Sequence, residues 1–591
     1  MKLLKFIIPI FIILLGIIYW SRSNSSNNEI ETDQTNNPFV YDDELLENGE
    51  KLFVMHCSSC HSLELEGIGP KLGGITTLIS KRELMDFIIS PSRAVESGNL
   101  RVSYLKERYK TVMPSFDFLD QSEISFILSY ISYETEKNKL KPLLIDTTQQ
   151  FTKGDRVVAP VAHSGLVIEL EDVIQIPLMQ DRFHDKGLAT LRAHPSGNGS
   201  LFISDQMGII YKVENEKTQA YLNVRERIKE FIFEPGIGTG LGSFDLYPDF
   251  LNNGVIYTTH AELYAGKPAI NDNDYVDSVG VALQWVLSEW TPDEVSARVF
   301  EGSRREVLRI NTPTTAHGFQ DIGFAPVKDK NDPDYAKLYI GTGDGGSINL
   351  KKPELSHNIK SLLGTIIRID PKGKNSQFGT YGIPDDNPFA QHKDTKVKKE
   401  IWAYGFRNPH RFSWELTAKR RLIAADIGES NVEEINIIEK GGDYGWSTIE
   451  GKMGIDILTD AKVVYKVSKD FLASYKLPFG QFDHMDGKAI SGGFVYQGDL
   501  QELKDIYVLG EIVSGKLFYM NINESLSDST IYDLTIIKNG MKTSIQQMSN
   551  LTRAHMRIGY DQYSGDLFVM TKADGMVRRV NKCYYEKDIN L

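Results

Sequence analysis

Two cysteines and a histidine near the amino terminus carry the most specific chemistry in this sequence. Cys57, Cys60 and His61 form the pattern Cys-x-x-Cys-His. Thiols with this spacing form thioether bonds to the vinyl groups of a haem, and the histidine that follows binds the iron. A redox dithiol or half of a zinc site would not require that histidine, and the only further cysteine is Cys583. The motif therefore predicts a covalently attached haem c.

Met113 is the predicted second ligand of the haem iron. Residues 42–136 resemble a class I cytochrome c, in which a methionine in a Met-Pro context after the haem motif closes the coordination sphere. Apolar residues at helical spacing predict one helix at 44–53, before the motif, and a terminal helix at 122–131 that packs against it. Ligation by histidine and methionine raises the haem potential and suits electron transfer. This domain shows that electrons move here but does not identify their source.

The length and charge of the chain limit its architecture and partners. A chain of 591 residues is too long for one hydrophobic core, so we expect two or more domains. The net charge of −13 argues against nucleic acid or an anionic membrane surface as partner. Lys2 and Lys5 precede an apolar run at 6–20, which is typical of an export signal or a short membrane anchor. We expect an uncleaved anchor in the inner membrane with the folded domains on the periplasmic side; cleavage would make the protein secreted.

Composition divides the chain into five segments. Residues 21–41 are rich in Ser and Asn and typical of a flexible linker, and a second polar connection follows the cytochrome region. The predicted division is an anchor at 1–20, a linker at 21–41, a cytochrome c domain at 42–136, a linker at 137–154 and an all-β domain at 155–585.

Short apolar strands recur through the large domain. Each contains β-branched or aromatic residues and is bounded by Gly, Asp, Asn or Lys. Six of them are evident, at 201–205, 255–259, 338–342, 422–426, 506–510 and 567–571. Their spacing of roughly seventy residues exceeds the usual 40–50 of a four-stranded propeller blade, and the excess would form long loops. The pattern favours a six-bladed β-propeller over the alternative, a tandem of β-sandwiches.

Ordered motifs in this domain resemble the glucose/sorbosone dehydrogenase family, the soluble pyrroloquinoline quinone (PQQ) sugar dehydrogenases. The most specific pair is Arg-Asn-Pro at 407–409 and Glu-Ile-Asn at 434–436 followed by Gly-Gly-Asp-Tyr-Gly-Trp at 441–446. The other segments are Tyr-Pro-Asp-Phe at 247–250, Ala-His-Gly-Phe at 316–319, the segment 339–345, the segment 364–370 and the segment 490–496. The resemblance covers most of residues 180–580 and implies a six-bladed propeller with quinone and calcium on one face.

The resemblance also implies roles for individual residues. His317 would be the base that takes the proton of a substrate hydroxyl while a hydride leaves the same carbon. Arg407 would stabilise the negative charge that develops on the quinone oxygen, with Asn408 at the edge of the cofactor. Read without the family, His317 would more often be structural and Arg-Asn-Pro could be only a turn.

The cofactor contacts implied by the family match this sequence less well. PQQ is a tricarboxylate, and near residue 515 the only candidate cations are Lys516 and Lys488. The loop that matches the family's calcium site is Gly428-Glu429, where backbone carbonyls would suit a hard cation. Ala316 replaces an acidic neighbour of the catalytic histidine.

Two functions remain. The first is a quinohaemoprotein dehydrogenase, in which a sugar or related alcohol reduces PQQ beside Ca²⁺ and electrons pass through haem c to an external acceptor. The fusion favours this function because a one-electron relay has little purpose beside a propeller without redox chemistry. The alternative is a non-catalytic propeller that binds carbohydrate or protein, as related hedgehog-interacting-like propellers do.

Overall fold

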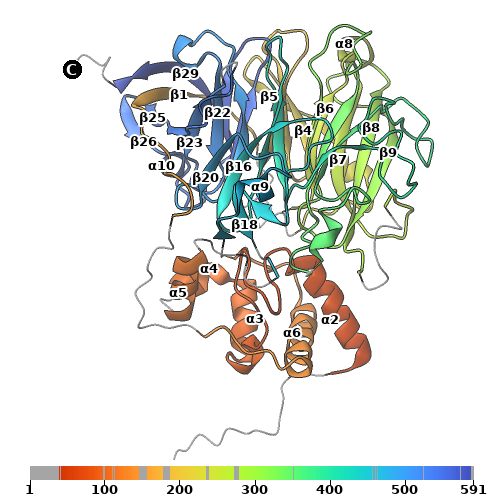
Figure 1. Cartoon of the computed structure of the whole chain (residues 1–591), viewed down its shortest axis with the longest axis vertical. Helices are drawn as coiled ribbons and strands as arrows, with labels where there is room; N and C mark the ends of the chain where they lie inside the picture. Colours follow the sequence, from red (N-terminus) through yellow and green to blue (C-terminus); the bar gives the residue numbers. More distant parts are fainter. Residues whose placement is uncertain are drawn as a thin grey trace, which may run out of the picture.

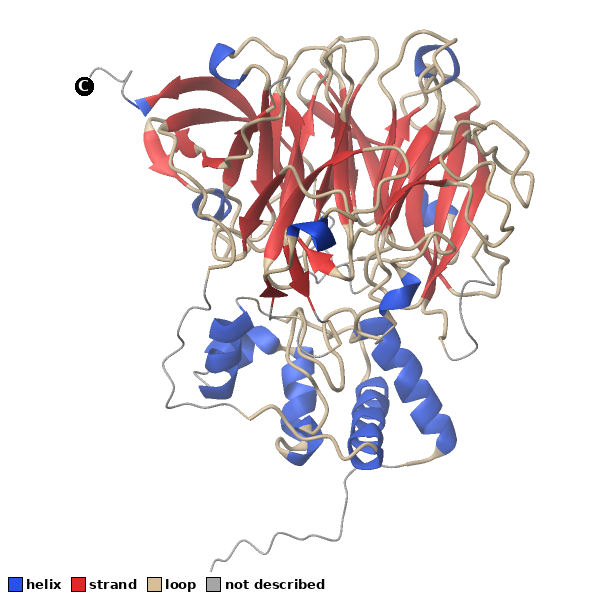
Figure 2. Ribbon diagram, in the orientation of Figure 1, coloured by secondary structure: helices blue, strands red, loops and turns tan. Residues whose placement is uncertain are grey.

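The computed structural model describes residues 39, 41–96, 100–109, 111, 113–144, 156–177, 187–234, 238–271, 279–350, 352–455, 457–458, 461, 464–522, 525–572 and 574–586. Within them, α-helices gather in an amino-terminal domain and strands fill a larger carboxy-terminal domain (Figure 1, Figure 2). The expected anchor at 1–20 lies outside the described residues. In the described part of the chain, no helix is both long and apolar enough to cross a membrane.

The amino-terminal domain is built from α-helices. They are α2 (Asp43–His56), α3 (Lys81–Ile89), α4 (Pro91–Glu96), α5 (Leu100–Tyr109) and α6 (Gln121–Lys137), with a 3₁₀ turn η1 (Ile75–Thr77). The predicted helices at 44–53 and 122–131 are confirmed as α2 and α6.

Helices α2 and α6 begin at capping residues and pack closely on each other. The Asp42 carboxylate accepts the first backbone N–H groups of α2, and Asp120 forms a capping box with Glu123 at the start of α6. A Cβ placed on Gly49 of α2 would lie 2.2 Å from the carbonyl oxygen of Phe126 in α6. Only glycine allows this approach, which fixes the helix that leads into the haem motif.

Among the described residues, six large sheets form the body of the larger domain. The first three are β2 (Leu188–Ala193), β3 (Leu201–Asp205), β4 (Ile209–Glu214), β5 (Lys217–Asn223); β6 (Leu241–Leu246), β7 (Ile256–Leu263), β8 (Leu283–Pro292), β9 (Gly302–Thr312); and β10 (Phe319–Phe324), β11 (Leu338–Thr342), β12 (Thr365–Ile369), β13 (Ile401–Tyr404). The fourth and fifth are β14 (Pro409–Trp414), β15 (Leu422–Asp426), β16 (Val432–Ile438), β20 (Gly480–Asp483); and β21 (Ile490–Val495), β22 (Ile506–Glu511), β23 (Leu517–Asn521), β24 (Tyr532–Asp533).

The sixth sheet joins strands from both ends of the domain. Its strands are β26 (Met541–Thr543), β25 (Thr535–Lys538), β1 (Leu166–Gln175), β29 (Met576–Tyr585), β28 (Leu567–Thr571) and β27 (Met556–Tyr560), in that order. Strand β1 pairs antiparallel with β29, so the first and last strands of the domain close the ring. The first strands of successive sheets contact one another in the circuit β2, β6, β10, β14, β21, β27 and back to β2. The architecture is therefore the expected six-bladed propeller.

The repeated strand predicted from the sequence has one position in every blade. The six segments fall on β3, β7, β11, β15, β22 and β28, each of which is hydrogen-bonded to the innermost strand of its sheet. This second strand is covered on both sides, and five of the six are buried along their whole length. Full burial explains why these strands are continuous apolar runs and were the visible repeat.

Smaller elements occupy the loops. They are the sheet of β17 (Ile449–Glu450), β18 (Met453–Ile455) and β19 (Val464–Tyr465), the short helices α7 (Val224–Arg227), α8 (Phe250–Asn253), α9 (Lys469–Leu472) and α10 (Ile545–Ser549), and the 3₁₀ turns η2 (Pro353–Leu355) and η3 (Gln501–Leu503).

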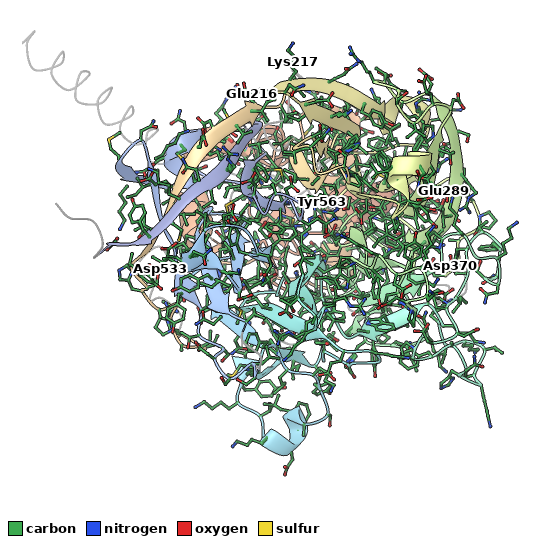
Figure 3. All side chains as sticks on the ribbon, turned by 90° about the horizontal axis from the view of Figure 1, so that it is seen from above. Glu216, Lys217, Glu289, Asp370, Asp533 and Tyr563 are labelled. Carbon is green, nitrogen blue, oxygen red and sulfur yellow. The ribbon has the colours of Figure 1, made fainter. Side chains whose placement is uncertain are left out.

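Antiparallel order decides which loops share a face of the propeller. A loop from the second to the third strand of a blade emerges on the same face as the loop that leads into the first strand of the next blade. The helical domain lies against one face (Figure 1), which we call the cytochrome-side face. Figure 3 looks down on the opposite face, with Tyr563 near the middle of the ring and Lys217, Glu289, Asp370 and Asp533 around it.

Candidate functional site

The haem motif continues directly from α2. The backbone N–H groups of Cys60 and His61 both donate to the carbonyl of Cys57, so the two thiols and the imidazole follow one tight turn. The Nδ1 atom of His61 lies 2.7 Å from the carbonyl oxygen of Pro70. A Cβ on Gly69 would lie 2.4 Å from Cε1 of His61, so this glycine lets the loop press against the ring. The loop orients the imidazole, and Nε2 is the ring nitrogen that would bind a haem iron.

Met113 and Cys57 pack on the same core. Both are partly buried against the cluster that contains Phe53, Phe116 and Ile127. The segment after Met113 is anchored by its backbone, since Phe116 N–H donates to Ile88 and Ser115 Oγ donates to Ile89. The assignment of Met113 as the second iron ligand stays a prediction, with the residue placed on the core that a haem would share.

His317 lies in the loop between β9 and β10, on the cytochrome-side face. Its Nδ1 is 2.7 Å from Oδ1 of Asp344, a carboxylate that is 1% exposed and follows β11. Burial raises the pKa of Asp344, but the neighbouring and hydrogen-bonded imidazole of His317, the charge of Arg407 and the N–H of Gly346 outweigh it, so this pKa lies below its ordinary value. The backbone of His317 is left-handed, with φ at 50°. Such strained residues cluster at functional sites.

Arg407 and Asn408 lie between β13 and β14, beside His317. The N–H of Asp344 donates to the Arg407 carbonyl at 2.7 Å, and the N–H of Gly345 donates to the His317 carbonyl at 3.2 Å. A Cβ on Gly343 would lie 2.5 Å from Cβ of His317 and 3.0 Å from Oδ1 of Asn408. The Gly-Asp-Gly segment therefore joins the two loops, and the structure brings together the three residues that the family resemblance had named.

The Arg407 side chain is buried in an ion pair. Its Nε donates to Oε2 of Glu429 at 2.8 Å, and its guanidinium lies 5.8 Å from the ring centre of Trp446. Trp446 also donates from Nε1 to Asp344 at 3.3 Å. The tryptophan of the Asp-Tyr-Gly-Trp motif thus contacts both the arginine and the partner of the histidine. Among described atoms, the buried Oδ1 of Asn408 has no hydrogen-bond partner.

Gly428 and Glu429 lie in the loop between β15 and β16, and the backbone of this loop binds the carboxylate of Glu450. The N–H groups of Ser430, Asn431 and Val432 all donate to Oε1 of Glu450. The carboxylate of Glu429 is occupied by Arg407. Within the described ranges, no group of three or more His, Cys, Asp and Glu side chains is arranged to hold a metal ion.

Two further carboxylates stand opposite each other below this loop. Asp426 and Glu434 are cross-strand partners on β15 and β16. Burial, followed by the charge of Glu434, raises the pKa of Asp426 well above its ordinary value, and burial raises that of Glu434 to about 7. Asn436 donates to Glu434 from Nδ2, while its Oδ1 has no partner among the described atoms. Asp426 accepts the N–H of Asn408, and Glu434 accepts the N–H of Gly451.

Buried cations come from blade six and not from the segment around residue 515. Lys516 is exposed, and its Nζ donates to the carbonyl of Asp486 at 2.7 Å, so the structure does not bring it to His317. Arg553 and Arg557 flank the start of β27, and in the described structure the Nε atoms of both are buried without a partner. Burial, together with the charges of Arg411 and Arg553, lowers the pKa of Arg557 to about 9.

Arg557 and Lys572 lie in the same region of the cytochrome-side face as His317, because all three act on the buried His410. Burial lowers the pKa of His410 well below its ordinary value, and the charges of Arg411, Arg557, Lys572 and His317 act on it in the same direction. Two kinds of functional residue were missed from the sequence, the acidic partner Asp344 and the arginines 553 and 557. A Gly-Asp-Gly-Gly segment after a repeated strand was the available signal for Asp344.

Comparison with known proteins supports this architecture. The sequence profile described as Glucose / Sorbosone dehydrogenase matches residues 190–569, and the profile described as Cytochrome c matches residues 46–134. The chain belongs to the glucose/sorbosone dehydrogenase family. It carries a cytochrome c domain ahead of the family's propeller.

The relatives divide between two kinds of protein. The HIPL1 protein of Arabidopsis thaliana is 29% identical over 295 residues, 44% of this chain and 41% of the relative. The aldose sugar dehydrogenase YliI of Escherichia coli is 27% identical over 187 residues, 32% of this chain and 44% of the relative. This chain therefore matches less than half the length of each. A crystal structure titled glucose dehydrogenase superimposes with a TM-score of 0.50 and 15% identity, covering 70% of this chain and 99% of that one, which shows the fold.

Proposed function

We propose that this protein is a quinohaemoprotein dehydrogenase. A sugar or related alcohol is oxidised with PQQ at the cytochrome-side face of the propeller, and electrons pass through a covalently bound haem c to an external acceptor. The observation that carries the proposal is the constellation of His317, its buried partner Asp344 and Arg407, on the same face as Arg553 and Arg557, whose buried Nε atoms have no partner among the described atoms. A propeller that only binds a partner does not require a histidine paired with a buried carboxylate.

His317 is suited to take a proton from a substrate hydroxyl. Because Nδ1 is held by Asp344, Nε2 is the nitrogen that remains for the substrate. The ionised carboxylate stabilises the positive charge that the imidazole gains with the proton. When bound, PQQ supplies a two-electron acceptor for the hydride that leaves the same carbon. Arg407 then stabilises negative charge in a buried setting where a fixed guanidinium is more effective than water.

The buried cations fit a tricarboxylate. Arg553 and Arg557 each present an Nε without a partner among the described atoms, and Lys572 is buried nearby. Unpartnered buried donors cost free energy, and carboxylates of a bound ligand would satisfy them with charge-assisted hydrogen bonds. We assign these arginines, in place of Lys516, to the cofactor carboxylates, with the Oδ1 of Asn408 free for a donor on the ligand.

A calcium ion would have to bind mainly through backbone carbonyl oxygens, because the carboxylate of Glu429 is already paired with Arg407. The carbonyls of Gly428 and Glu429 are the proposed ligands. Asp426 ends β15 just before them, and Glu434 and Asn436 lie on the neighbouring strand β16. Hard cations prefer such oxygen donors, and a cation would relieve the crowding of the two facing carboxylates. Removing calcium with a chelator should therefore weaken quinone binding without releasing the haem.

We also propose that the protein works outside the cytoplasm, on the periplasmic side of the inner membrane. The proposal rests on the apolar run at 6–20 after Lys2 and Lys5 and on the haem-attachment motif. Fractionation of cells that produce the full chain would test it: haem staining should be found with inner membranes, and staining only in the cytosol would contradict it.

Binding of the quinone can be measured separately from turnover. Titration of the haem-loaded protein with PQQ in the presence of Ca²⁺ should show saturable binding, and an aldose panel should then reduce an artificial dye. Arg557→Gln should weaken PQQ binding by about 10- to 100-fold, because a hydrogen bond to a charged group contributes about 1.5–3 kcal/mol. Arg420→Gln, at a partly exposed arginine of blade four, is the matched control. Absence of PQQ binding and of dye reduction would favour the binding-module function instead.

A further inference from the structure

The haem-attachment segment rests on the cytochrome-side face. We call residues 57–70 the haem loop. The Nδ2 of Asn349 in blade three donates to the carbonyl of Ser58 in the haem loop. A Cβ on Gly67 would lie 3.4 Å from Oε1 of Glu429 and 3.5 Å from Oδ1 of Asn349. A second contact joins Arg553 Nη1 to Thr111 Oγ1 at 3.2 Å, two residues before Met113.

Each propeller residue in this contact is a direct neighbour of the proposed quinone site. Glu429 is the carboxylate that binds Arg407. Arg553 precedes β27, the strand that carries Arg557. Asn349 lies in the same β11–β12 connection as Asp344. The carbonyl of Cys60 accepts the N–H of Gly69 at 2.9 Å, so Cys60 lies in the same tight loop as Gly67. Cys60 is one of the two points at which a haem would be attached.

We propose that the haem of each chain takes its electrons directly from the quinone site of its own propeller, across the contact between the haem loop and residues Asn349, Glu429 and Arg553. This inference rests on the proposed function. Oxidation of one alcohol delivers two electrons and two protons to the propeller. Ferric iron takes one electron at a time and becomes ferrous, so the haem is reduced twice per alcohol. Each electron leaves to an external one-electron acceptor, and the two protons leave to solvent.

The contact explains how a one-electron centre serves this site without a separate carrier. Because both partners belong to one chain, docking is intramolecular and requires only a small interface to be well populated. One contact involves the segment that would hold the haem through Cys57 and Cys60, and the other involves the segment just before Met113. The residues that would hold the haem on both of these segments therefore lie next to the propeller residues of the proposed quinone site.

The concentration dependence of haem reduction tests whether transfer stays within one chain. The protein is loaded with PQQ and Ca²⁺, mixed with a reducing sugar identified by the dye assay, and followed at the reduced haem band. The rate constant should be unchanged over a 20-fold range of protein concentration. When a trace of this protein is mixed with excess His317→Ala protein, only the haem of the intact chains should be reduced in the fast phase. A rate that rises in proportion to concentration would overturn the proposal, while loss of dye reduction itself would overturn the proposed function.

A charge at Gly67 tests the contact itself. Gly67→Glu places a carboxylate against Glu429, and like charges across an interface are strongly unfavourable. Haem reduction by sugar should slow by at least about tenfold, whereas dye reduction by sugar should be retained. Gly280→Glu is the matched control, because a Cβ there meets nothing within 4 Å. An unchanged rate of haem reduction in Gly67→Glu would contradict the proposal.

Hydrogen exchange provides a readout that requires neither quinone nor sugar. In the haem-loaded protein, amides of the haem loop and of residues 553–557 should be protected by the contact. Gly67→Glu should lose that protection in both segments together, and Asn349→Ala should lose part of it near Ser58. Equal protection in all three proteins would show that the two domains do not dock in this way.

Discussion

One histidine in each domain has its Nδ1 fixed by a hydrogen bond of the same length, but the two bonds go to chemically different groups. In the cytochrome domain, His61 bonds the neutral carbonyl of Pro70, at 2.7 Å. In the propeller, His317 bonds the buried carboxylate of Asp344, also at 2.7 Å. A neutral carbonyl orients an imidazole that must stay uncharged to bind iron. A carboxylate also stabilises the charged form, which a proton acceptor must reach. The partner of Nδ1 thus distinguishes the proposed iron ligand, His61, from the proposed base, His317.

Removing the propeller histidine should have the largest effect. His317→Ala should lower sugar-dependent dye reduction by about 10²- to 10⁴-fold, the usual contribution of a general base. PQQ binding, measured by titration, should be retained, because the arginines that we assign to its carboxylates are untouched. His392→Ala, at an exposed histidine of blade three, should behave as the parent protein. Turnover retained in His317→Ala would remove this residue as the base.

The variant Asp344→Asn replaces the charged partner of His317 by a neutral side chain of the same shape. It therefore tests whether His317 requires a charged partner. Asp344→Asn should lower kcat/KM by about 10- to 100-fold, a typical cost of losing the group that orients a functional histidine. The expected effect is on kcat and not on KM, because Asp344 is buried behind His317. An unchanged kcat in Asp344→Asn would show that the charge of Asp344 does not contribute to proton acceptance by His317.

The same variant makes a prediction about pH. The pKa of Asp344 in the folded protein lies below its ordinary value of about 3.9. A group of this kind stabilises the fold above its unfolded pKa, and the contribution is lost as the pH falls through the folded pKa. The difference in unfolding free energy between the parent and Asp344→Asn should therefore be largest near neutral pH and shrink below about pH 4. Thermal unfolding of the propeller at several pH values measures it; a difference that grows with acidity would have the wrong sign.

Met113→Ala tests the other histidine through the opposite axial position. Loss of the thioether should lower the haem potential by a sizeable part of the roughly 0.8 V that axial ligands span. Dye reduction by sugar should be unaffected, since Met113 lies in the cytochrome domain. Redox titration of the haem band gives the potential. If potential and onward transfer are both unchanged, Met113 is not the ligand.

A third histidine, His56, provides the smallest effect and a baseline for the other two. His56 is buried against Phe116 and Phe118, and its Nδ1 has no partner among the described atoms. Burial lowers its pKa to about 4. The unfolded chain therefore binds a proton first, and stability falls as the pH drops from about 6.5 to about 4, by at most about 1.4 kcal/mol per pH unit.

His56→Phe should remove that slope from the unfolding of the cytochrome domain. Replacement of an unpartnered ring by an apolar one keeps the packing against Phe116. The measurement is chemical unfolding of the haem-loaded protein between pH 4 and pH 7. A slope that persists in His56→Phe would assign the pH dependence to another group.

Local patterns predicted much of this molecule. The haem motif, helices α2 and α6, and the second strand of every blade follow from residue type and spacing within short windows. The partners of the functional side chains do not. Asp344 meets His317, and Glu429 meets Arg407, because loops of neighbouring blades emerge on one face, and that depends on closure of the whole ring. Arg553 and Arg557 lie over 140 residues from Arg407 in the sequence, so no local pattern connects them. Lys516 was assigned from its position in a turn, and its side chain is exposed and donates to the carbonyl of Asp486.

The central claim is that the propeller oxidises its substrate and passes the electrons to its own haem. Anaerobic addition of an aldose to the protein loaded with PQQ and Ca²⁺ tests it most directly, with the reduced haem band as the signal. The band should appear only when quinone and sugar are both present, at a rate independent of protein concentration, and should be absent in His317→Ala. A haem that stays oxidised with every sugar and alcohol tried, in protein that has bound the quinone, would contradict the account.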